Sequence, residues 1–276
     1  MRFFLNIFDY SMQLDFSGYL DTAERWCDYT APFSNEVREE PSKRVDLALE
    51  LDLVKGWHNP DVREGFAIEY AGGRPVGVRV SRPAAVGTIA RADGCFEGSL
   101  KVSADYPDSI DFVVGTGLAM LCEERGDILL HSSAVLMDEG AWLFLGDGGA
   151  GKTTIAVELN GGGVPMSVDR TLVTARFDEQ LRAWGTPFGD SDGFVKRALD
   201  APIAGLVFID QADRHELSSI GEWETLQGLL RQSVSASRDR GSVDRLMKMA
   251  GILAEAGLSR RMKFRRDDGF WDLLRS

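Results

Sequence analysis

The sequence contains little of what disulfide frameworks and metal clusters require. Of its 276 residues, three are cysteines (Cys27, Cys95 and Cys122) and three are histidines. Cysteines that are odd in number and widely spaced fit neither a disulfide framework nor a zinc site. We therefore expect buried free thiols in a reducing compartment.

Long apolar runs are also lacking. No stretch approaches the roughly 18 consecutive apolar residues that a membrane-spanning helix needs. The apolar start, Met1 to Leu5, meets Asp9 before the hydrophobic region of a signal peptide can form. The sequence thus predicts a cytoplasmic protein that has no membrane partner.

Positive charge is scarce as well. The 31 lysines and arginines stand against 43 aspartates and glutamates, a net charge of −12. No overall basic field would attract a nucleic acid, so we expect no nucleic-acid partner. A basic cluster does occur near the C-terminus, and it comprises Arg260, Arg261, Lys263, Arg265 and Arg266. Because Asp267 and Asp268 follow at once, we interpret it as a solvated face, with docking of an acidic peptide as the alternative.

The remaining composition, 44% hydrophobic and 27% charged, is that of a globular protein. Alternating apolar residues on both sides of a turn at 71–74 predict a hairpin, and 100–102 a further strand. We expect helices at 21–29 and 111–125, whereas 46–54 is ambiguous between helix and strand. The sequence predicts a β-rich region over 1–125, which would carry substrate recognition, and an α/β domain over 126–276.

The second half alternates short apolar runs with helical patterns. Strands are predicted over 128–131, 134–137, 141–145, 165–168, 171–176, 181–184 and 202–210, with a turn at 178–179. A helix over 155–159 should end at the stop signal 160–163. Two helices should follow the last strand, and the second places Val243, Leu246, Met249, Ala250 and Leu253 on one face.

The most informative motif is GDGGAGKT, which matches G-x-x-x-x-G-K-[ST] between a predicted strand and a predicted helix. Its residues and the one that follows are the expected nucleotide-binding set: Gly146, Asp147, Gly148, Gly149, Ala150, Gly151, Lys152, Thr153 and Thr154. The glycines let backbone N–H groups converge on phosphates, and the helix N-terminus adds a favourable dipole. Lys152 would reach the β- and γ-phosphates of ATP, and the Thr153 hydroxyl would bind Mg²⁺.

Two residues outside the motif are candidates for catalysis. Asp169 follows the strand after the loop's helix, where a carboxylate can hold Mg²⁺ or accept a proton from an attacking hydroxyl. His131 lies on a neighbouring strand, where it could touch phosphate or substrate. Taken alone, Asp169 fits a cap or surface acid better than a catalytic group, and His131 fits a core histidine better.

Together, these residues carry a resemblance to a known family. The block from His131 to Arg170 resembles the catalytic core of HPr kinase/phosphorylases and, more loosely, of phosphoenolpyruvate carboxykinases. Within that family it is most similar to the small divergent kinases of lasso-peptide clusters, which phosphorylate a serine of a precursor peptide. The resemblance implies a P-loop nucleotide-binding α/β domain with a β-rich N-terminal portion, and a catalytic set of Asp169, His131 and Lys152.

The chain departs from the family pattern at one position. The family carries two consecutive acids where this chain has Asp169 followed by Arg170. Either Asp169 serves as both metal ligand and base, or another residue helps. Asp190 and Asp192 are candidates for that role, although their sequence context favours turn residues. Arg170 could instead stabilise the transferred phosphoryl group.

These observations predict an ATP- and Mg²⁺-dependent kinase that phosphorylates a serine, or a threonine, of a peptide or small protein. One alternative is a nucleotide-binding regulator or slow ATPase, and another is a kinase of a small-molecule hydroxyl. The sequence is compatible with an oligomer.

Overall fold

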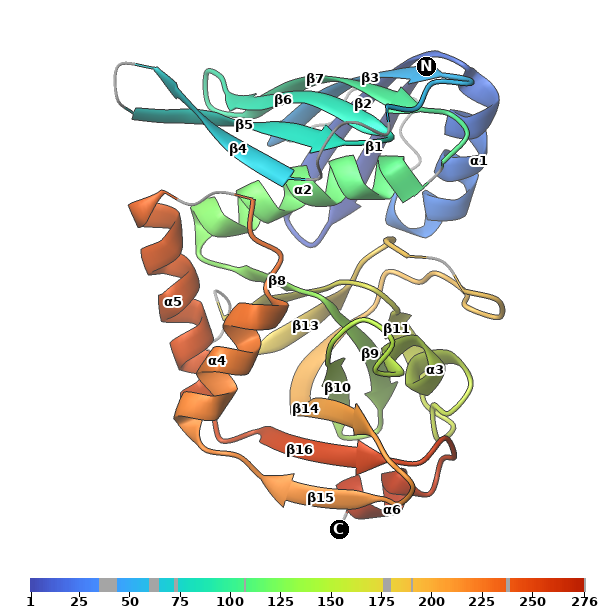
Figure 1. Cartoon of the computed structure of the whole chain (residues 1–276), viewed down its shortest axis with the longest axis vertical. Helices are drawn as coiled ribbons and strands as arrows, with labels where there is room; N and C mark the ends of the chain where they lie inside the picture. Colours follow the sequence, from blue (N-terminus) through green and yellow to red (C-terminus); the bar gives the residue numbers. More distant parts are fainter. Residues whose placement is uncertain are drawn as a thin grey trace. The chain divides into compact units, whose positions relative to one another are not determined.

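The computed structural model describes residues 1–34, 44–59, 65–71, 74–106, 108–175, 180–189, 191–236 and 239–275 (Figure 1). The chain forms two compact units. The first comprises Met1–Glu123 and Ser235–Val243, and the second comprises Glu124–Val234 and Asp244–Ser276. The second unit is thus interrupted by a short segment that belongs to the first. Each unit contains a sheet that mixes parallel and antiparallel strands, so the protein is of the mixed α/β class.

The first unit is built on a seven-stranded sheet of order β1-β2-β3-β7-β6-β5-β4. Its strands are β1 (Arg2–Ile7), β2 (Tyr10–Gly18), β3 (Leu47–Val54), β4 (Gly65–Ala71), β5 (Arg74–Arg82), β6 (Ala85–Arg91) and β7 (Phe96–Ser103). Its helices are α1 (Leu20–Thr30), the 3₁₀ turn η1 (Ala31–Phe33) and α2 (Asp108–Arg125), whose last two residues fall in the second unit.

Alternating leucines account for the strand over the ambiguous segment. Leu47, Leu49, Leu51 and Leu53 of β3 are all buried, which is the period-two pattern of a strand with one face on the core. Helix α2 packs closely against it, because a Cβ atom added to Gly117 would lie 2.3 Å from Leu47 Cδ2. The predicted hairpin, the strand at 100–102 and both helices of this region are confirmed, while turn residues 72 and 73 lie outside the described residues.

The second unit carries a nine-stranded sheet, with the path β11-β9-β10-β14-β13-β12-β8 and β16 and β15 attached beside β14. Its strands are β8 (Ile128–Leu130), β9 (Ser132–Met137), β10 (Gly140–Leu145), β11 (Val164–Ser167), β12 (Thr171–Thr174), β13 (Arg182–Gly185), β14 (Asp200–Gln211), β15 (Glu216–Ser219) and β16 (Ser259–Phe264). Its helices are α3 (Lys152–Val157), α4 (Glu222–Gln232), most of α5 (Arg240–Glu255) and α6 (Phe270–Leu274).

Three parallel neighbours, β10, β14 and β16, form the part of this sheet that positions the glycine-rich loop. All three strands end at the same edge, and the segments that follow their carboxyl ends come together there. In open α/β sheets this edge is the usual place for a ligand.

Two antiparallel strand pairs follow one another along the chain, and the hydrogen-bond ladder is interrupted between them. Strand β9 pairs with β11 and β8 pairs with β12, both antiparallel, and the chain passes directly from β8 to β9 and from β11 to β12. Thr171 is opposite Leu130 and Ser167 is opposite Ala134, so residues 131–133 face residues 168–170 across the break. His131 and Asp169 both lie in this break because the two strands leave one another at the same point.

Several expectations for the second unit need correction. Helix α3 ends at Val157 rather than Leu159, because the backbone past it turns away and the Leu159 carbonyl accepts a hydrogen bond from Trp271 Nε1 at 2.6 Å. Val243 is 41% exposed and does not share the buried face of α5. Strands β15 and β16 and helix α6 were not predicted. The predicted strands are confirmed with shifted ends, and the turn at 178–179 lies outside the described residues.

Candidate nucleotide site

The glycine-rich loop leaves β10 and presents a row of backbone donors. Gly149 and Gly151 have φ angles of 79° and 102°, in the left-handed region that glycine adopts without strain. Within the described residues, no acceptor bonds the backbone N–H groups of Gly149, Gly151, Lys152 and Thr153. The N–H of Ala150, between them, donates to the Asp147 carbonyl at 3.1 Å. Unpaired N–H groups gathered in such a turn form a concave site for an anion.

Lys152 lies beneath this loop, with 7% of its surface exposed. Its Nζ atom donates hydrogen bonds to the carbonyl oxygens of Gly146 at 2.6 Å and Asp147 at 3.1 Å. Burial lowers the pKa of Lys152, and the nearby carboxylates of Asp169 and Asp147 oppose that shift. The ammonium group is therefore held inside the loop by two carbonyl acceptors.

The helix after the loop is too short to supply much of the expected dipole. α3 has six residues, and its N-cap, Gly151, makes no side-chain cap. Its first turn is fixed instead by Ser133 Oγ on β9, which donates to the Lys152 carbonyl at 2.7 Å. The donors of the candidate anion site are therefore the backbone N–H groups of the loop itself, and the helix dipole adds little.

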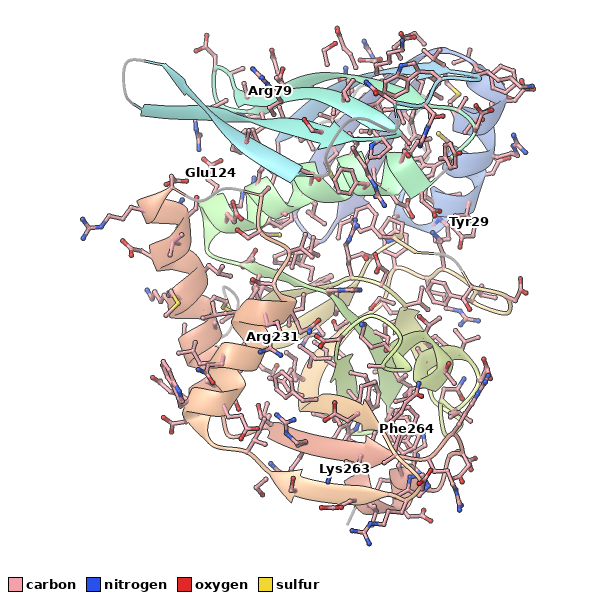
Figure 2. The ribbon with its side chains drawn as sticks, in the orientation of Figure 1. Tyr29, Arg79, Glu124, Arg231, Lys263 and Phe264 are labelled. Atoms are coloured by element: carbon pink, nitrogen blue, oxygen red, sulfur yellow. The ribbon has the colours of Figure 1, made fainter. Side chains whose placement is uncertain are left out.

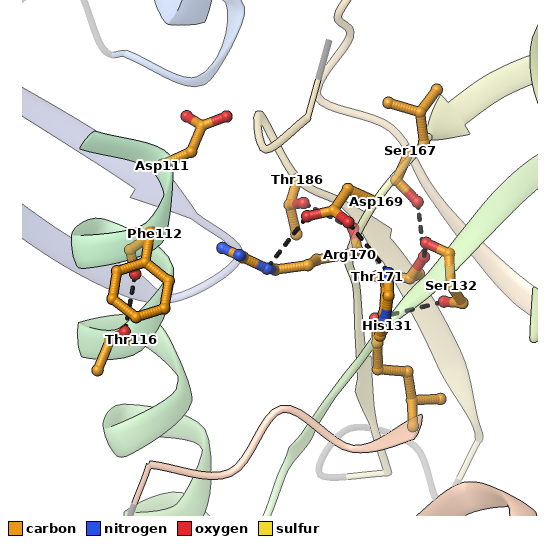
Figure 3. Close-up of polar contacts among 12 residues, drawn as sticks. Asp111, Phe112, Thr116, His131, Ser132, Ser167, Asp169, Arg170, Thr171 and Thr186 are labelled. Atoms are coloured by element: carbon orange, nitrogen blue, oxygen red, sulfur yellow. Dashed lines mark hydrogen bonds and ion pairs between the residues drawn. The ribbon is translucent and has the colours of Figure 1, made fainter. Parts of the chain in front are cut away.

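Asp169 contacts two basic side chains, and Figure 3 draws one dashed line from its carboxylate to His131 and one to Arg170. Its Oδ1 atom is 3.3 Å from His131 Nε2, and its Oδ2 atom is 3.2 Å from Arg170 Nε. Burial raises the pKa of Asp169, but the His131 hydrogen bond and the charges of Arg170, His131 and Lys152 outweigh it, so the pKa is lowered. The structure thus brings His131, Lys152, Asp169 and Arg170 into one electrostatic group.

Arg170 is packed rather than extended into solvent. Only 15% of its side chain is exposed, and its guanidinium carbon lies 5.2 Å from the centre of the Phe188 ring. Its backbone carbonyl accepts a hydrogen bond from Thr186 Oγ1 at 2.6 Å. Ser167 and Thr171, which flank the break, share a hydrogen bond of 2.6 Å that holds the two strand ends together. The position of Arg170 is therefore fixed by the fold.

Oxygen donors suited to Mg²⁺ lie next to the loop. Thr153 Oγ1 lies 3.4 Å from the backbone carbonyl oxygen of Val168, which is the residue before Asp169. The Thr153 hydroxyl therefore lies next to the segment that carries the Asp169 carboxylate. Mg²⁺ prefers such oxygen ligands and is usually held by one or two protein groups together with substrate phosphates and water. Within the described part of the chain, no group of three or more His, Cys, Asp or Glu side chains is placed to bind a metal. Thr153 and Asp169 are therefore the residues whose side-chain oxygens could hold such an ion.

Two glutamines that no motif indicated hold the loop. Gln232, at the end of α4, donates from Nε2 to Asp147 Oδ1 at 3.2 Å, and its carbonyl accepts from the His131 N–H at 2.7 Å. Gln211, at the end of β14, donates from Nε2 to the Gly149 carbonyl at 2.9 Å. Both are far from the loop in sequence, so only their positions at strand and helix ends could have suggested them.

The other acidic candidates have different outcomes. Asp190 lies outside the described residues, and Asp192 is exposed on the loop between β13 and β14. Among the described residues, Asp192 makes no contact with Asp169 and so does not act as a second carboxylate beside it. Gly189, by contrast, approaches closely, because a Cβ atom added there would lie 2.6 Å from Asp169 Cβ.

The C-terminal basic cluster is largely paired with acids of the same unit. Its ion pairs are Arg261 with Asp210 and Glu224, Lys263 with Glu216, Arg265 with Asp267, and Arg266 with Glu158. An acidic peptide would have to compete with these partners. The contacts favour the solvated-face interpretation.

Fold and site together define a mixed α/β protein in which a glycine-rich loop lies at the carboxyl ends of three parallel strands. Comparison of the chain with models of known protein families and with curated proteins gives no match. No helix among the described residues is both long and apolar enough to cross a membrane.

Proposed function

We propose that this protein is an ATP-dependent kinase that transfers the γ-phosphoryl group to a serine, or a threonine, of a peptide or small protein. The observation that carries the proposal is the position of Lys152, which lies under the glycine-rich loop and interacts with Asp169. Asp169 is in turn held by His131 and Arg170. The identity of the acceptor as a serine rests on the resemblance of the His131–Arg170 block to HPr kinase-like enzymes.

The loop and Lys152 would bind and neutralise the phosphates. Backbone N–H groups that lack an acceptor in the described residues are free to bind phosphate oxygens. The Lys152 ammonium would exchange its two carbonyl acceptors for those oxygens. Bound Mg²⁺, held by Thr153 and Asp169, would supply further neutralisation of the phosphate charge.

Asp169 would orient the acceptor hydroxyl more than it would accept its proton. A carboxylate whose pKa is lowered is a weak base. Phosphoryl transfer proceeds through a loose transition state in which positioning and charge neutralisation provide most of the catalysis. A weakly basic carboxylate fixed by His131 is therefore adequate, and Arg170 provides positive charge beside it.

One observation favours a second candidate, a nucleotide-binding regulator or slow ATPase. Both carboxylate oxygens of Asp169 already contact basic side chains, those of His131 and Arg170. Arg170 also stands where the family that the block resembles has its second acid. An arginine in that position opposes binding of a second cation. In this alternative the site would bind ATP without passing phosphate to an acceptor.

The test is incubation of the purified protein with γ-labelled ATP and Mg²⁺, alone and with serine-containing peptides encoded by neighbouring genes. Label on a peptide serine that is lost in Lys152→Ala supports the kinase. Labelled inorganic phosphate, or bound nucleotide without a labelled peptide or metabolite, supports the regulator. A labelled metabolite would instead indicate the small-molecule kinase.

A further inference from the structure

A cavity of about 250 Å³ opens beside the glycine-rich loop. Its lining residues are Gly151, Thr154, Gln211, Ala212, Phe264 and Arg266. They come from the loop, from α3 and from the carboxyl ends of β14 and β16. Figure 2 labels Phe264 and Lys263 at the end of β16, where Phe264 is 2% exposed and Lys263 extends to the surface.

The cavity and the loop are directly joined. A Cβ atom added to Gly151 would lie 2.6 Å from Phe264 Cζ, so the aromatic ring touches the loop backbone. Gln211 lines the cavity and also donates to the Gly149 carbonyl. A ligand in the cavity would therefore also contact the glycine-rich loop at Gly151.

The order of the strands gives the ligand a direction. The loop follows β10, with β9 and β11 on one side and β14 and β16 on the other. Asp169 and His131 lie on the β9–β11 side, next to Thr153. The cavity lies on the β14–β16 side, next to Thr154. A phosphate chain across the loop would thus place one end at Asp169 and the other at the cavity.

We infer that this cavity is the subsite for the nucleoside half of the triphosphate, with the γ-phosphate directed toward Asp169. The inference rests on the proposed function and adds the location of the base and ribose to it. The lining suits that chemistry, because the Phe264 ring offers an apolar wall and Arg266 a planar cation. Arg266 is 72% exposed and pairs with Glu158 at 2.7 Å, so it can shift onto a bound base.

The test compares ATP with inorganic tripolyphosphate, which has the phosphates but no nucleoside. Ala212→Trp would place a bulky side chain in the cavity and leave every residue of the loop unchanged. We expect its Kd for ATP to rise at least about tenfold while its Kd for tripolyphosphate changes less than about twofold. Ser218→Trp, which adds the same side chain at an exposed position of β15, is the matched control. Both ligands are measured by calorimetry in the presence of Mg²⁺.

Further variants keep the test decisive if Ala212→Trp does not fold. Ala212→Val and Arg266→Ala should weaken ATP binding in the same selective way, by smaller factors. If folded cavity variants bound ATP with an unchanged Kd, the inference would be overturned while the proposed kinase activity would stand. The same would hold if these variants raised only the KM for the peptide. Failure of the wild-type protein to bind either ligand would reject the nucleotide site itself.

Discussion

The His131 and Asp169 side chains meet at the break between two strand pairs, with His131 Nε2 at 3.3 Å from Asp169 Oδ1. The contact depends on register, because the ladder is interrupted over residues 131–133 and 168–170. Neither side chain is held by a regular ladder there. Both can therefore point to the same side, toward the loop that carries Lys152.

Replacing His131 should raise the pKa of Asp169. The hydrogen bond from His131 helps to hold this pKa below its ordinary value of 3.8 despite the opposing effect of burial. The stability that the ionised carboxylate contributes is present above the unfolded-state pKa and is lost as pH falls through the lowered folded-state pKa. In His131→Ala that loss should move to higher pH, as measured by carbon NMR titration of the Asp169 carboxyl group.

The comparison for this titration is His58→Ala, which removes a histidine of the other unit. It should leave the Asp169 titration unchanged. The account of Asp169 would be wrong if its pKa were the same in His131→Ala and in the wild-type protein.

Lys152→Ala should abolish phosphoryl transfer. Removal of one preorganised charge-stabilising group typically lowers turnover by about 10²–10³-fold, and the loop would also lose the cation that binds its carbonyls. Lys248→Ala, at an exposed position of α5, is the matched control and should retain full activity. Initial rates with γ-labelled ATP measure both. Near-normal transfer by Lys152→Ala would exclude the loop as the phosphate site.

Asp169→Asn should remove turnover while leaving ATP binding largely intact. The amide keeps the shape of the side chain but loses the charge that orients the hydroxyl and binds Mg²⁺. Asp192→Asn changes an exposed carboxylate on a nearby loop and should have little effect. Single-turnover rates and ATP titrations separate transfer from binding. If Asp192→Asn were the more damaging change, the catalytic role would pass to Asp192.

Gln232→Leu should weaken the loop without changing the chemistry. Asp147 would lose the 3.2 Å hydrogen bond from Gln232 Nε2. Because Asp147 is exposed and water can replace that donor, the bond should contribute about 0.5–1.5 kcal/mol. The free energy of unfolding should fall by about that amount, and KM for ATP should rise more than kcat falls. Gln227→Leu, exposed on the same helix, should stay within about 0.5 kcal/mol of wild type. Chemical denaturation and steady-state kinetics measure the two effects.

Two glycines of the loop should respond differently to alanine. Gly151 has a φ of 102° and no room for a Cβ atom against Phe264, whereas a Cβ atom on Gly148 would meet nothing within 4 Å. Gly151→Ala should destabilise the protein by about 1–3 kcal/mol and reduce ATP affinity. Gly148→Ala should change neither measurement much. Equal effects of the two substitutions would contradict the loop conformation.

Much of the fold could be predicted from local patterns. The glycine stop after α2 and the turn between β9 and β10 are signals within a few residues, whereas the leucines of β3 alone leave 46–54 ambiguous between helix and strand. The unpredicted β1 and β2 also alternate, since Leu5 and Ile7 of β1 and Met12, Leu14 and Phe16 of β2 are buried. In β16, arginines and a lysine at neighbouring positions hide the burial of Met262 and Phe264. Charge obscured the period-two pattern there, because long basic side chains can lie on a half-buried strand.

The site divides in the same way. The sequence by itself determined the glycine-rich loop, because its strand, glycines and lysine are contiguous and the backbone conformation is a local property. Tertiary structure alone decided that Gln211 and Gln232 hold the loop, that Arg170 packs on Phe188 beside Asp169, and that a cavity opens between β14, β16 and α3. These contacts join residues that are distant in the chain, and their geometry depends on strand register and sheet order. No local pattern specifies either.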